Sequence, residues 1–395
     1  MINRNSKSII QKALAEFPAV VLTGARQVGK STLARHLWPG ATYVTLDLPS
    51  VAALAERDPE VFWQLHPAPL IVDEVQYAPA LLRHLKVRLD QDRRPGQYLL
   101  TGSQGFGLME GVAESLAGRV AVLELGTLSG MELGLGRGME GWHDYLWRGG
   151  YPELASQPER DRELWFQSYV ATYLERDVRS ALRVNSLLDF DRFLRAAALR
   201  VGQLLSYADL ARDLGVAPNT VRSWLSVLQA SGLVYLLEPY HRQRRKRLSK
   251  APKLYWRDTG LLTFLLGFRT FEDLRRHALW GAVWENLVVA EVVKLNQQQL
   301  RPRPLWAWRT VHGQEVDLLV ELGPDAFLAL ECKASEQPGS EALQGLRGLQ
   351  DDADGTLQLT PRVVCPTRES YPLGQADAWA IAPVDLAEAL RLTDA

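Results

Sequence analysis

Residues 19–38 read AVVLTGARQVGKSTLARHLW, and this stretch decides the fold of the N-terminal part of the chain. An apolar run, AVVLT, leads into GARQVGKST and then into a segment with helical periodicity. The middle segment matches G-x-x-x-x-G-K-[ST], in which glycines let backbone N–H groups turn toward a phosphate and the following helix N-terminus adds partial positive charge. Strand, loop and helix therefore occur in the order that a phosphate-binding loop requires.

This loop predicts a site for ATP and Mg²⁺. Lys30 is expected to contact the β- and γ-phosphates, and Ser31 to offer its hydroxyl to Mg²⁺. The alternative is a glycine-containing turn that holds no nucleotide, which the flanking strand and helix disfavour. The predicted nucleotide-binding residues are Gly24, Ala25, Arg26, Gln27, Val28, Gly29, Lys30, Ser31 and Thr32.

Two more apolar runs predict further parallel strands that end in polar residues. LIV at 70–72 is followed by Asp73 and Glu74, a Walker B pattern. We expect Asp73 to hold Mg²⁺ through water and Glu74 to deprotonate the attacking water, although two acids could instead cap the next helix. YLLT at 98–101 precedes Ser103, a candidate sensor of the γ-phosphate. Arg119 is either an arginine finger for a neighbouring subunit or a cation beside a helix C-terminus.

Composition limits the class of protein. A length of 395 residues favours two or three domains, and 47% apolar with 23% charged residues argues against disorder or a fibrous repeat. The net charge of -1 identifies no polyanionic partner by itself. Cys332 and Cys365 are too few for a disulfide framework, which favours a reducing cytoplasm. The N-terminus lacks a signal-peptide pattern, and no apolar run approaches the ~20 residues that cross a bilayer.

The middle of the chain resembles a winged helix. Residues 159–205 have helical spacing, Ser206 is placed to cap a helix, and a second helix opens at Pro218. Two strand patterns follow, on either side of a basic stretch at 242–253 in which seven of twelve residues are Lys or Arg. The stretch predicts contact with a polyanion, or else a solvated loop or a subunit contact. The candidate nucleic-acid contacts are Thr220, Arg222, Arg242, Arg244, Arg245, Lys246, Arg247 and Lys250.

Four chemically matched residues lie near the C-terminus. Glu285 is in a long helical segment, and three strand patterns with an expected antiparallel order carry Asp317, Glu331 and Lys333. Carboxylates in apolar strands are costly to bury unless they are paired or bind a metal. We therefore predict that Asp317 and Glu331 bind a metal ion and that all four residues form a nuclease-like catalytic centre. A salt-bridged remnant without chemistry is the alternative.

Taken together, these segments resemble the prokaryotic AAA+ ATPases that carry a C-terminal PD-(D/E)xK nuclease-like domain of unknown function. The resemblance rests on TGARQVGKST, LIVDEVQ, LLTGSQ, SLAGRV, RGGYPE, KLYWRDTGLL, WENLV, VDLLVE and ECKAS, in that order along most of the chain. It implies an α/β protein with an AAA+ parallel-sheet domain at 1–135, a helical and winged-helix domain at 136–250 and a PD-(D/E)xK-like domain at 251–395. It also implies ATP hydrolysis and a homo-oligomer, such as a ring.

The sequence thus predicts an ATP-hydrolysing protein that acts on branched or ended DNA. The alternative is a nucleotide-dependent switch whose C-terminal domain binds protein or nucleic acid without catalysis. A small-molecule kinase is disfavoured, because Glu74 follows Asp73 at the strand end.

Overall fold

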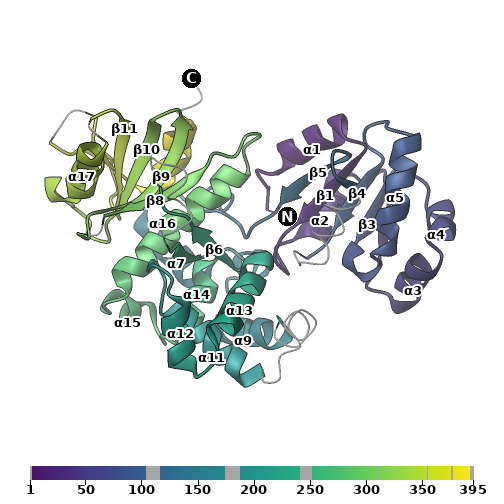
Figure 1. Ribbon diagram of the computed structural model, residues 1–395, viewed down its shortest axis with the longest axis horizontal. Helices are drawn as coiled ribbons and strands as arrows, with labels where there is room; N and C mark the ends of the chain where they lie inside the picture. Colours follow the sequence, from purple (N-terminus) through teal and green to yellow (C-terminus); the bar gives the residue numbers. More distant parts are fainter. Residues whose placement is uncertain are drawn as a thin grey trace. The chain divides into compact units, whose positions relative to one another are not determined.

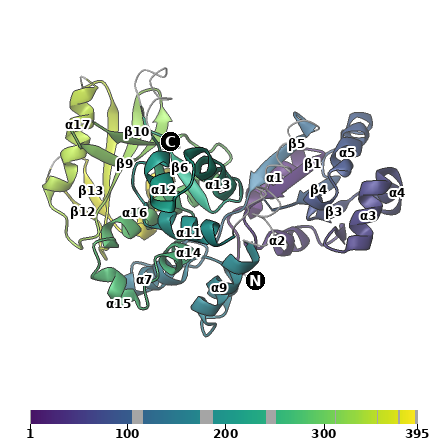
Figure 2. The same cartoon turned by 60° about the horizontal axis from the view of Figure 1, so that its bottom comes forward.

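The computed structural model describes residues 2–103, 116–173, 187–240, 251–310, 312–353, 355–374 and 377–391. The chain divides into two compact units (Figures 1 and 2). The first comprises Met1–Leu128 with Val227–Leu233, and the second comprises Ser129–Ser226 with Val234–Ala395. In the described part of the chain, no helix has both the length and the apolar character needed to span a membrane.

The first unit is built on a five-stranded sheet of order β2-β3-β4-β1-β5, in which every paired strand is parallel. Its strands are β1 (Ala19–Thr23), β2 (Thr42–Thr45), β3 (Leu70–Asp73), β4 (Tyr98–Thr101) and β5 (Val120–Glu124). Its helices are α1 (Lys7–Glu16), α2 (Lys30–Leu37), α3 (Pro49–Arg57), α4 (Pro59–Leu65), η1 (Val75–Tyr77) and α5 (Ala80–Gln91). Figure 1 shows α5 next to the sheet, with α3 and α4 packed on α5.

The order of these strands creates the edge at which the loops gather. β1, β3 and β4 are buried along their whole length, as their continuous apolar runs predict for a sheet covered on both faces. β4 lies between β1 and β3, so the loops after all three strands emerge at one edge. β2 and β5 were not predicted from the sequence, because they are only partly buried and their apolar pattern is weak.

The second unit begins with helices and continues into a mixed α/β part. Its helices are α7 (Met139–Arg148), α8 (Pro152–Ser156), α9 (Arg162–Tyr173), α11 (Leu187–Ala198), α12 (Tyr207–Leu214), α14 (Thr259–Leu265), α15 (Phe271–Arg275), α16 (Trp280–Gln297), η4 (Ser340–Leu343), α17 (Gln344–Asp352), η5 (Pro383–Asp385) and α18 (Leu386–Arg391). The helix α13 (Pro218–Ala230) belongs to this unit up to Ser226 and to the first unit from Val227. Its strands are β6 (Val234–Leu237), β7 (Lys253–Trp256), β8 (Leu305–Arg309), β9 (Glu315–Gly323), β10 (Ala326–Cys332), β11 (Gln358–Val364), β12 (Tyr371–Pro372) and β13 (Trp379–Ile381).

A six-stranded sheet of order β12-β13-β11-β10-β9-β8 forms the C-terminal core. β8, β9 and β10 are antiparallel neighbours, as predicted, and β11 joins β10 in parallel. Leu346 and Leu349 of α17 pack against Leu319 and Ala329 of this sheet, and Figure 2 shows α17 beside it. α16, at 18 residues the long helix predicted from the sequence, contacts β10 and β7.

The helices and hairpin of the middle segment occur where the sequence predicts them. Ser206 accepts a hydrogen bond from the amide of Asp209 at 3.2 Å and so caps α12, and α13 begins at Pro218. β6 and β7 pair in antiparallel register. The domain boundary predicted after residue 250 falls between these two paired strands. After β6, the amide of Tyr240 donates to the backbone oxygen of Ala307 in β8 at 2.6 Å. The hairpin is therefore hydrogen-bonded to the C-terminal sheet within one unit.

Candidate functional site

The loop between β1 and α2 has the backbone that its glycines allow. Gly24 has φ +144°, and a Cβ there would lie 2.1 Å from the backbone oxygen of Leu125, so only glycine fits. Gln27 also has a positive φ of 61°. Lys30 is buried, and its Nζ donates to the backbone oxygens of Gly24 and Ala25 at 3.0 and 2.9 Å. The ammonium group is thus held over the loop.

Asp73 organises the polar groups at the edge of the sheet. Its Oδ1 accepts hydrogen bonds from the hydroxyls of Ser31, at 2.7 Å, and Thr101, and its Oδ2 accepts one from Tyr43 at 2.7 Å. Burial, followed by the hydrogen bond to Asp73, raises the pKa of Tyr43, so the phenol stays protonated as a donor. Ser31 and Asp73, both predicted to serve Mg²⁺, are therefore in contact, and oxygen donors of this kind suit Mg²⁺.

Glu74 follows β3 in a left-handed conformation, with φ 58° and ψ 47°. Such a backbone is uncommon for a residue with a Cβ and concentrates at functional sites. Nε2 of Gln76 donates to the Glu74 carboxylate and, at 3.2 Å, to Oγ of Ser103. The amide of Gln76 thus links the predicted base to the predicted sensor. Sequence reasoning missed Gln76 and Tyr43, although both are polar residues in or beside strands of this sheet.

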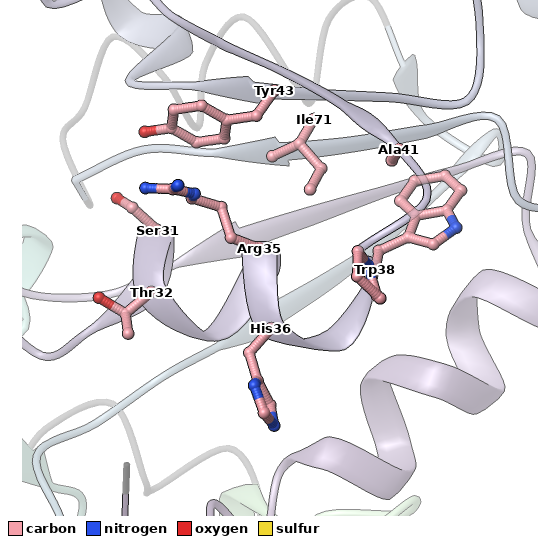
Figure 3. A pocket seen from close by; sticks show the side chains of 9 residues that line it. Ser31, Thr32, Arg35, His36, Trp38, Ala41, Tyr43 and Ile71 are labelled. Atoms are coloured by element: carbon pink, nitrogen blue, oxygen red, sulfur yellow. The ribbon is translucent and has the colours of Figure 1, made fainter.

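A cavity of about 570 Å³ opens beside Ser31 (Figure 3). The polar ends of Ser31, Arg35 and Tyr43 gather at one end of it, and Trp38 lies at the other. The Arg35 guanidinium carbon lies 4.9 Å from the centre of the Tyr43 ring, a cation–π contact. Arg35, one helical turn after Ser31, therefore places a cation beside this cavity.

Arg119 has a partner within its own unit. Its Nε and Nη2 donate to the two carboxylate oxygens of Asp90 on α5, at 2.7 and 3.0 Å. The hydrogen bond to Arg119 is the first cause that holds the pKa of Asp90 below its usual value. Arg119 is thus engaged in a bidentate ion pair, a role that the sequence did not suggest.

The predicted nucleic-acid contacts are only partly described by the structure. Thr220 and Arg222 lie in α13, where Thr220 is half-buried and Arg222 is exposed with its guanidinium carbon 5.2 Å from the Tyr207 ring centre. The basic residues Arg242, Arg244, Arg245, Lys246, Arg247 and Lys250 lie outside the described residues.

Near the C-terminus, the predicted carboxylates gather around a lysine that the sequence did not place there. Nζ of Lys253 lies 3.0 Å from Oε1 of Glu285, 3.6 Å from Oδ1 of Asp317 and 3.7 Å from Oε2 of Glu315. The Lys253 side chain is 2% exposed. Sequence reasoning assigned Lys253 to the basic stretch, because position along the chain does not show that β7 turns it inward.

Glu331 and Lys333 form the other half of this centre. Nζ of Lys333 donates to Oε2 of Glu331 at 3.2 Å, while Oε1 of the buried Glu331 has no hydrogen-bond partner among the residues that the structure describes. Gly345 of α17 makes room for this carboxylate, since a Cβ there would lie 2.6 Å from Oε1 of Glu331. Oδ2 of Asp317 accepts from the amide of Cys332 at 2.8 Å.

These contacts bear on the predicted metal site. Metal binding was predicted because carboxylates in apolar strands are costly to bury unless they are paired or bind a metal, and Lys253 pairs with Glu285 and Asp317. Among the residues that the structure describes, no group of three or more His, Cys, Asp or Glu side chains is arranged to hold a metal. Lys253 and Lys333 already pair with these carboxylates, and metal binding by Asp317 and Glu331 stays a prediction.

Asn286, which the sequence did not single out, fastens β7 to α16. It is fully buried, its Oδ1 accepts from the amide of Trp256 at 2.7 Å, and its Nδ2 donates to the oxygen of the same residue at 3.0 Å. The adjacent Trp284 donates to the backbone oxygen of Val364 at 3.2 Å. The segment Trp284-Glu285-Asn286 thus contacts β11, Lys253 and β7 in turn.

Burial also changes the protonation of the centre. It raises the pKa of Glu331 to about 9 and that of Glu285 to about 7, with the charge of Asp317 as the second cause in both cases. Burial opposes ionisation of Lys253, but the carboxylates of Glu285 and Asp317 outweigh it and hold the pKa above its usual value. Lys253 therefore stays charged at neutral pH, while Glu331 keeps its proton.

A pH dependence of stability follows from Glu331. Above pH 4.5 the unfolded chain loses this proton while the folded protein retains it up to about pH 9, so the free energy of unfolding falls as pH rises between these values. The slope is up to ~1.4 kcal/mol per pH unit for one such group. Denaturant unfolding at a series of pH values measures it. Glu331→Gln should flatten the slope, whereas Glu272→Gln, an exposed residue on α15, should not.

Family models match most of the chain. Residues 16–134 match the AAA domain family, residues 139–272 match a domain of unknown function (DUF8612), and residues 280–386 match another (DUF4143). The 139–272 match contains both strands of the β6–β7 hairpin. The N-terminal unit is therefore a P-loop domain of the AAA ATPase class.

Two mycobacterial proteins are similar along nearly the whole chain. Uncharacterized protein Rv2008c of Mycobacterium tuberculosis and uncharacterized protein Mb2031c of Mycobacterium bovis are each 34% identical over 387 residues, which cover 97% of this chain and 83% of the relative. Among solved structures, the Walker-type ATPase PABY2304 of Pyrococcus abyssi aligns with a TM-score of 0.44 and 15% identity, over 67% of this chain and 96% of that one.

Proposed function

Since the chain belongs to the family of Rv2008c and Mb2031c and carries an N-terminal AAA domain, we propose that it hydrolyses ATP to act on DNA, with branched or ended DNA as the substrate. The observation that carries the proposal is the contact of Ser31 with Asp73, directly before Glu74 and beside the Lys30 loop. Oligomerisation is part of the same proposal, with Arg119 exchanging Asp90 for the nucleotide of a neighbouring subunit.

The residues present fit Mg²⁺-ATP, because the loop offers backbone amides and Lys30 while Ser31 and Asp73 offer oxygen ligands. Bound Mg²⁺-ATP supplies the phosphoanhydride bond that is broken, with its charge partly neutralised by the cation. Lys30 binds phosphate oxygens in place of the carbonyls of Gly24 and Ala25. Glu74 orients a water molecule and accepts its proton, and Gln76 with Ser103 holds the carboxylate in position.

The DNA-binding part of the proposal rests on α12, α13 and the hairpin that follows them. Asn219, Arg222 and Ser223 are exposed near the start of α13, where a recognition helix contacts a groove. The β6–β7 hairpin brackets the basic residues of 242–250, which have the charge to bind phosphates on either strand. In this proposal the winged helix binds the phosphate backbone of the DNA, and the PD-(D/E)xK-like domain also binds the DNA.

A second candidate is a nucleotide-dependent switch whose C-terminal domain has no catalytic activity. The ammonium group of Lys253 among the carboxylates favours this candidate over a nuclease. The two candidates differ in turnover, because an enzyme that acts on DNA hydrolyses ATP faster when DNA is present. ATP hydrolysis measured with no DNA, duplex, single strand and a four-way junction separates them. Equal rates in all four would contradict the proposal.

Neutralising Arg244, Arg245 and Arg247 together should weaken binding to DNA of every sequence, because phosphate contacts carry no base information. The slope of log affinity against log salt should become shallower by roughly 0.9 for each phosphate that is no longer neutralised. Binding of one duplex from low to moderate salt measures both effects. A matched variant, in which Arg192, Arg195 and Arg276 are neutralised instead, serves as control. An unchanged affinity and slope would show that the basic stretch contacts no DNA.

A further inference from the structure

Lys253 is held in the carboxylate centre by the backbone on both sides of it. It pairs with Leu237 in the β6–β7 ladder and forms an isolated bridge with Leu204. The next residue, Leu254, exchanges backbone hydrogen bonds with Gly202 and Gln203 at 2.8 and 3.1 Å. Strand pairing therefore fixes the backbone of Lys253, and the ion pairs with Glu285 and Asp317 hold its buried ammonium group.

The distances around Nζ are those of an ammonium group among carboxylates. Oxygens of Glu285 and Asp317 lie 3.0 and 3.6 Å from Nζ, so the point between them is already occupied by a cation. The hydroxyl of Tyr255 donates to the same Oε1 of Glu285. A divalent ion at this point would face the charge of Lys253 at close range in a poorly solvated space.

Two observations show an unsatisfied polar atom and open space beside these carboxylates. Oε1 of Glu331 is buried and has no hydrogen-bond partner in the described part of the chain, and Glu331 lies on the strand next to that of Asp317. A cavity of about 290 Å³ is lined by Lys253 with Leu204 and Arg309 among its neighbours. Because Lys253 both lines this cavity and pairs with Glu285 and Asp317, we expect a shorter side chain at this position to let an ion reach the two carboxylates.

We propose that Lys253 is the resident cation of this centre, so that the protein binds no divalent metal there, and that it closes a latent divalent-cation site formed by Glu285 and Asp317. This role of Lys253 is independent of the proposed ATPase and DNA activities. One lysine provides the charge that a metal ion would otherwise supply. Metal-dependent cleavage at this centre is consequently absent from the wild-type protein.

Calorimetric titration of Mn²⁺ into the full-length, nucleotide-free protein tests the proposal. The wild-type protein should bind no Mn²⁺ at this centre. Asp317→Asn, which removes a carboxylate of the centre, should therefore give the same Mn²⁺ titration as wild type. Lys253→Ala should gain one equivalent of bound Mn²⁺ that the wild-type titration lacks. The double variant Lys253→Ala/Asp317→Asn should lose that gain.

Lys294→Ala is the matched control, because Lys294 is also a buried lysine paired with a glutamate, Glu291, at 3.2 Å. It should gain no Mn²⁺ site. Wild-type binding of one equivalent that Asp317→Asn abolishes would overturn the proposal, and so would a folded Lys253→Ala that gains nothing. If Lys253→Ala fails to fold, Lys253→Met/Glu285→Gln removes one charge of each sign. If this double variant folds and the wild-type protein binds no Mn²⁺ at the centre, the resident-cation role of Lys253 is supported. If the double variant also fails to fold, the role is contradicted.

Discussion

Glu74→Gln should keep ATP binding and lower ATP hydrolysis by roughly 10²- to 10⁴-fold, the range that a general base contributes. The amide is close in shape to the carboxylate, so the left-handed turn after β3 is retained, but it cannot accept a proton from water. Nucleotide titration and phosphate release measure binding and turnover separately.

Lys30→Ala completes this test, because it removes the cation that contacts the phosphates and should therefore abolish binding as well as turnover. Glu60→Gln is the matched control, since Glu60 is an exposed carboxylate of the same unit paired with Arg88 at 3.2 Å. It should hydrolyse ATP at the wild-type rate. Hydrolysis by Glu74→Gln at the wild-type rate would remove the role assigned to Glu74.

Asn286→Ala should lower the free energy of unfolding of the second unit by about 3 kcal/mol, because it leaves the amide and carbonyl of Trp256 buried without partners. For a unit of this size, the midpoint of thermal unfolding should fall by roughly 5 to 10 °C. Calorimetry or circular dichroism during heating measures the shift. ATP binding below the transition should be unchanged, because Asn286 lies in the other unit.

Asn219→Ala provides the comparison for this effect, since Asn219 is exposed near the start of α13. Its unfolding midpoint should stay within about 2 °C of the wild-type value. A loss of stability in Asn286→Ala no larger than that of the control would show that β7 is held to α16 by other interactions.

The nucleotide site was largely predictable from local sequence. The loop with Lys30 and Ser31, and the strand end with Asp73 and Glu74, each occupy a short segment in which apolar periodicity, turn residues and chemistry coincide. Parallel pairing then requires these strand ends to share one edge. Tyr43 and Gln76 were missed because their hydrogen bonds to Asp73 and Glu74 depend on side-chain directions that periodicity does not define.

By itself, the sequence determined the phosphate-binding loop, the Walker B strand, the helix with Glu285 and the antiparallel strands with Asp317 and Glu331, because each depends on contacts within a short segment. Only the tertiary structure decided what surrounds those carboxylates. Lys253 is 32 residues from Glu285 and 64 from Asp317 along the chain, and it reaches both because β7 pairs with β6 and is fastened by Asn286. Burial favours these ion pairs, because an ammonium or carboxylate group that is excluded from water is costly unless it is paired with an opposite charge.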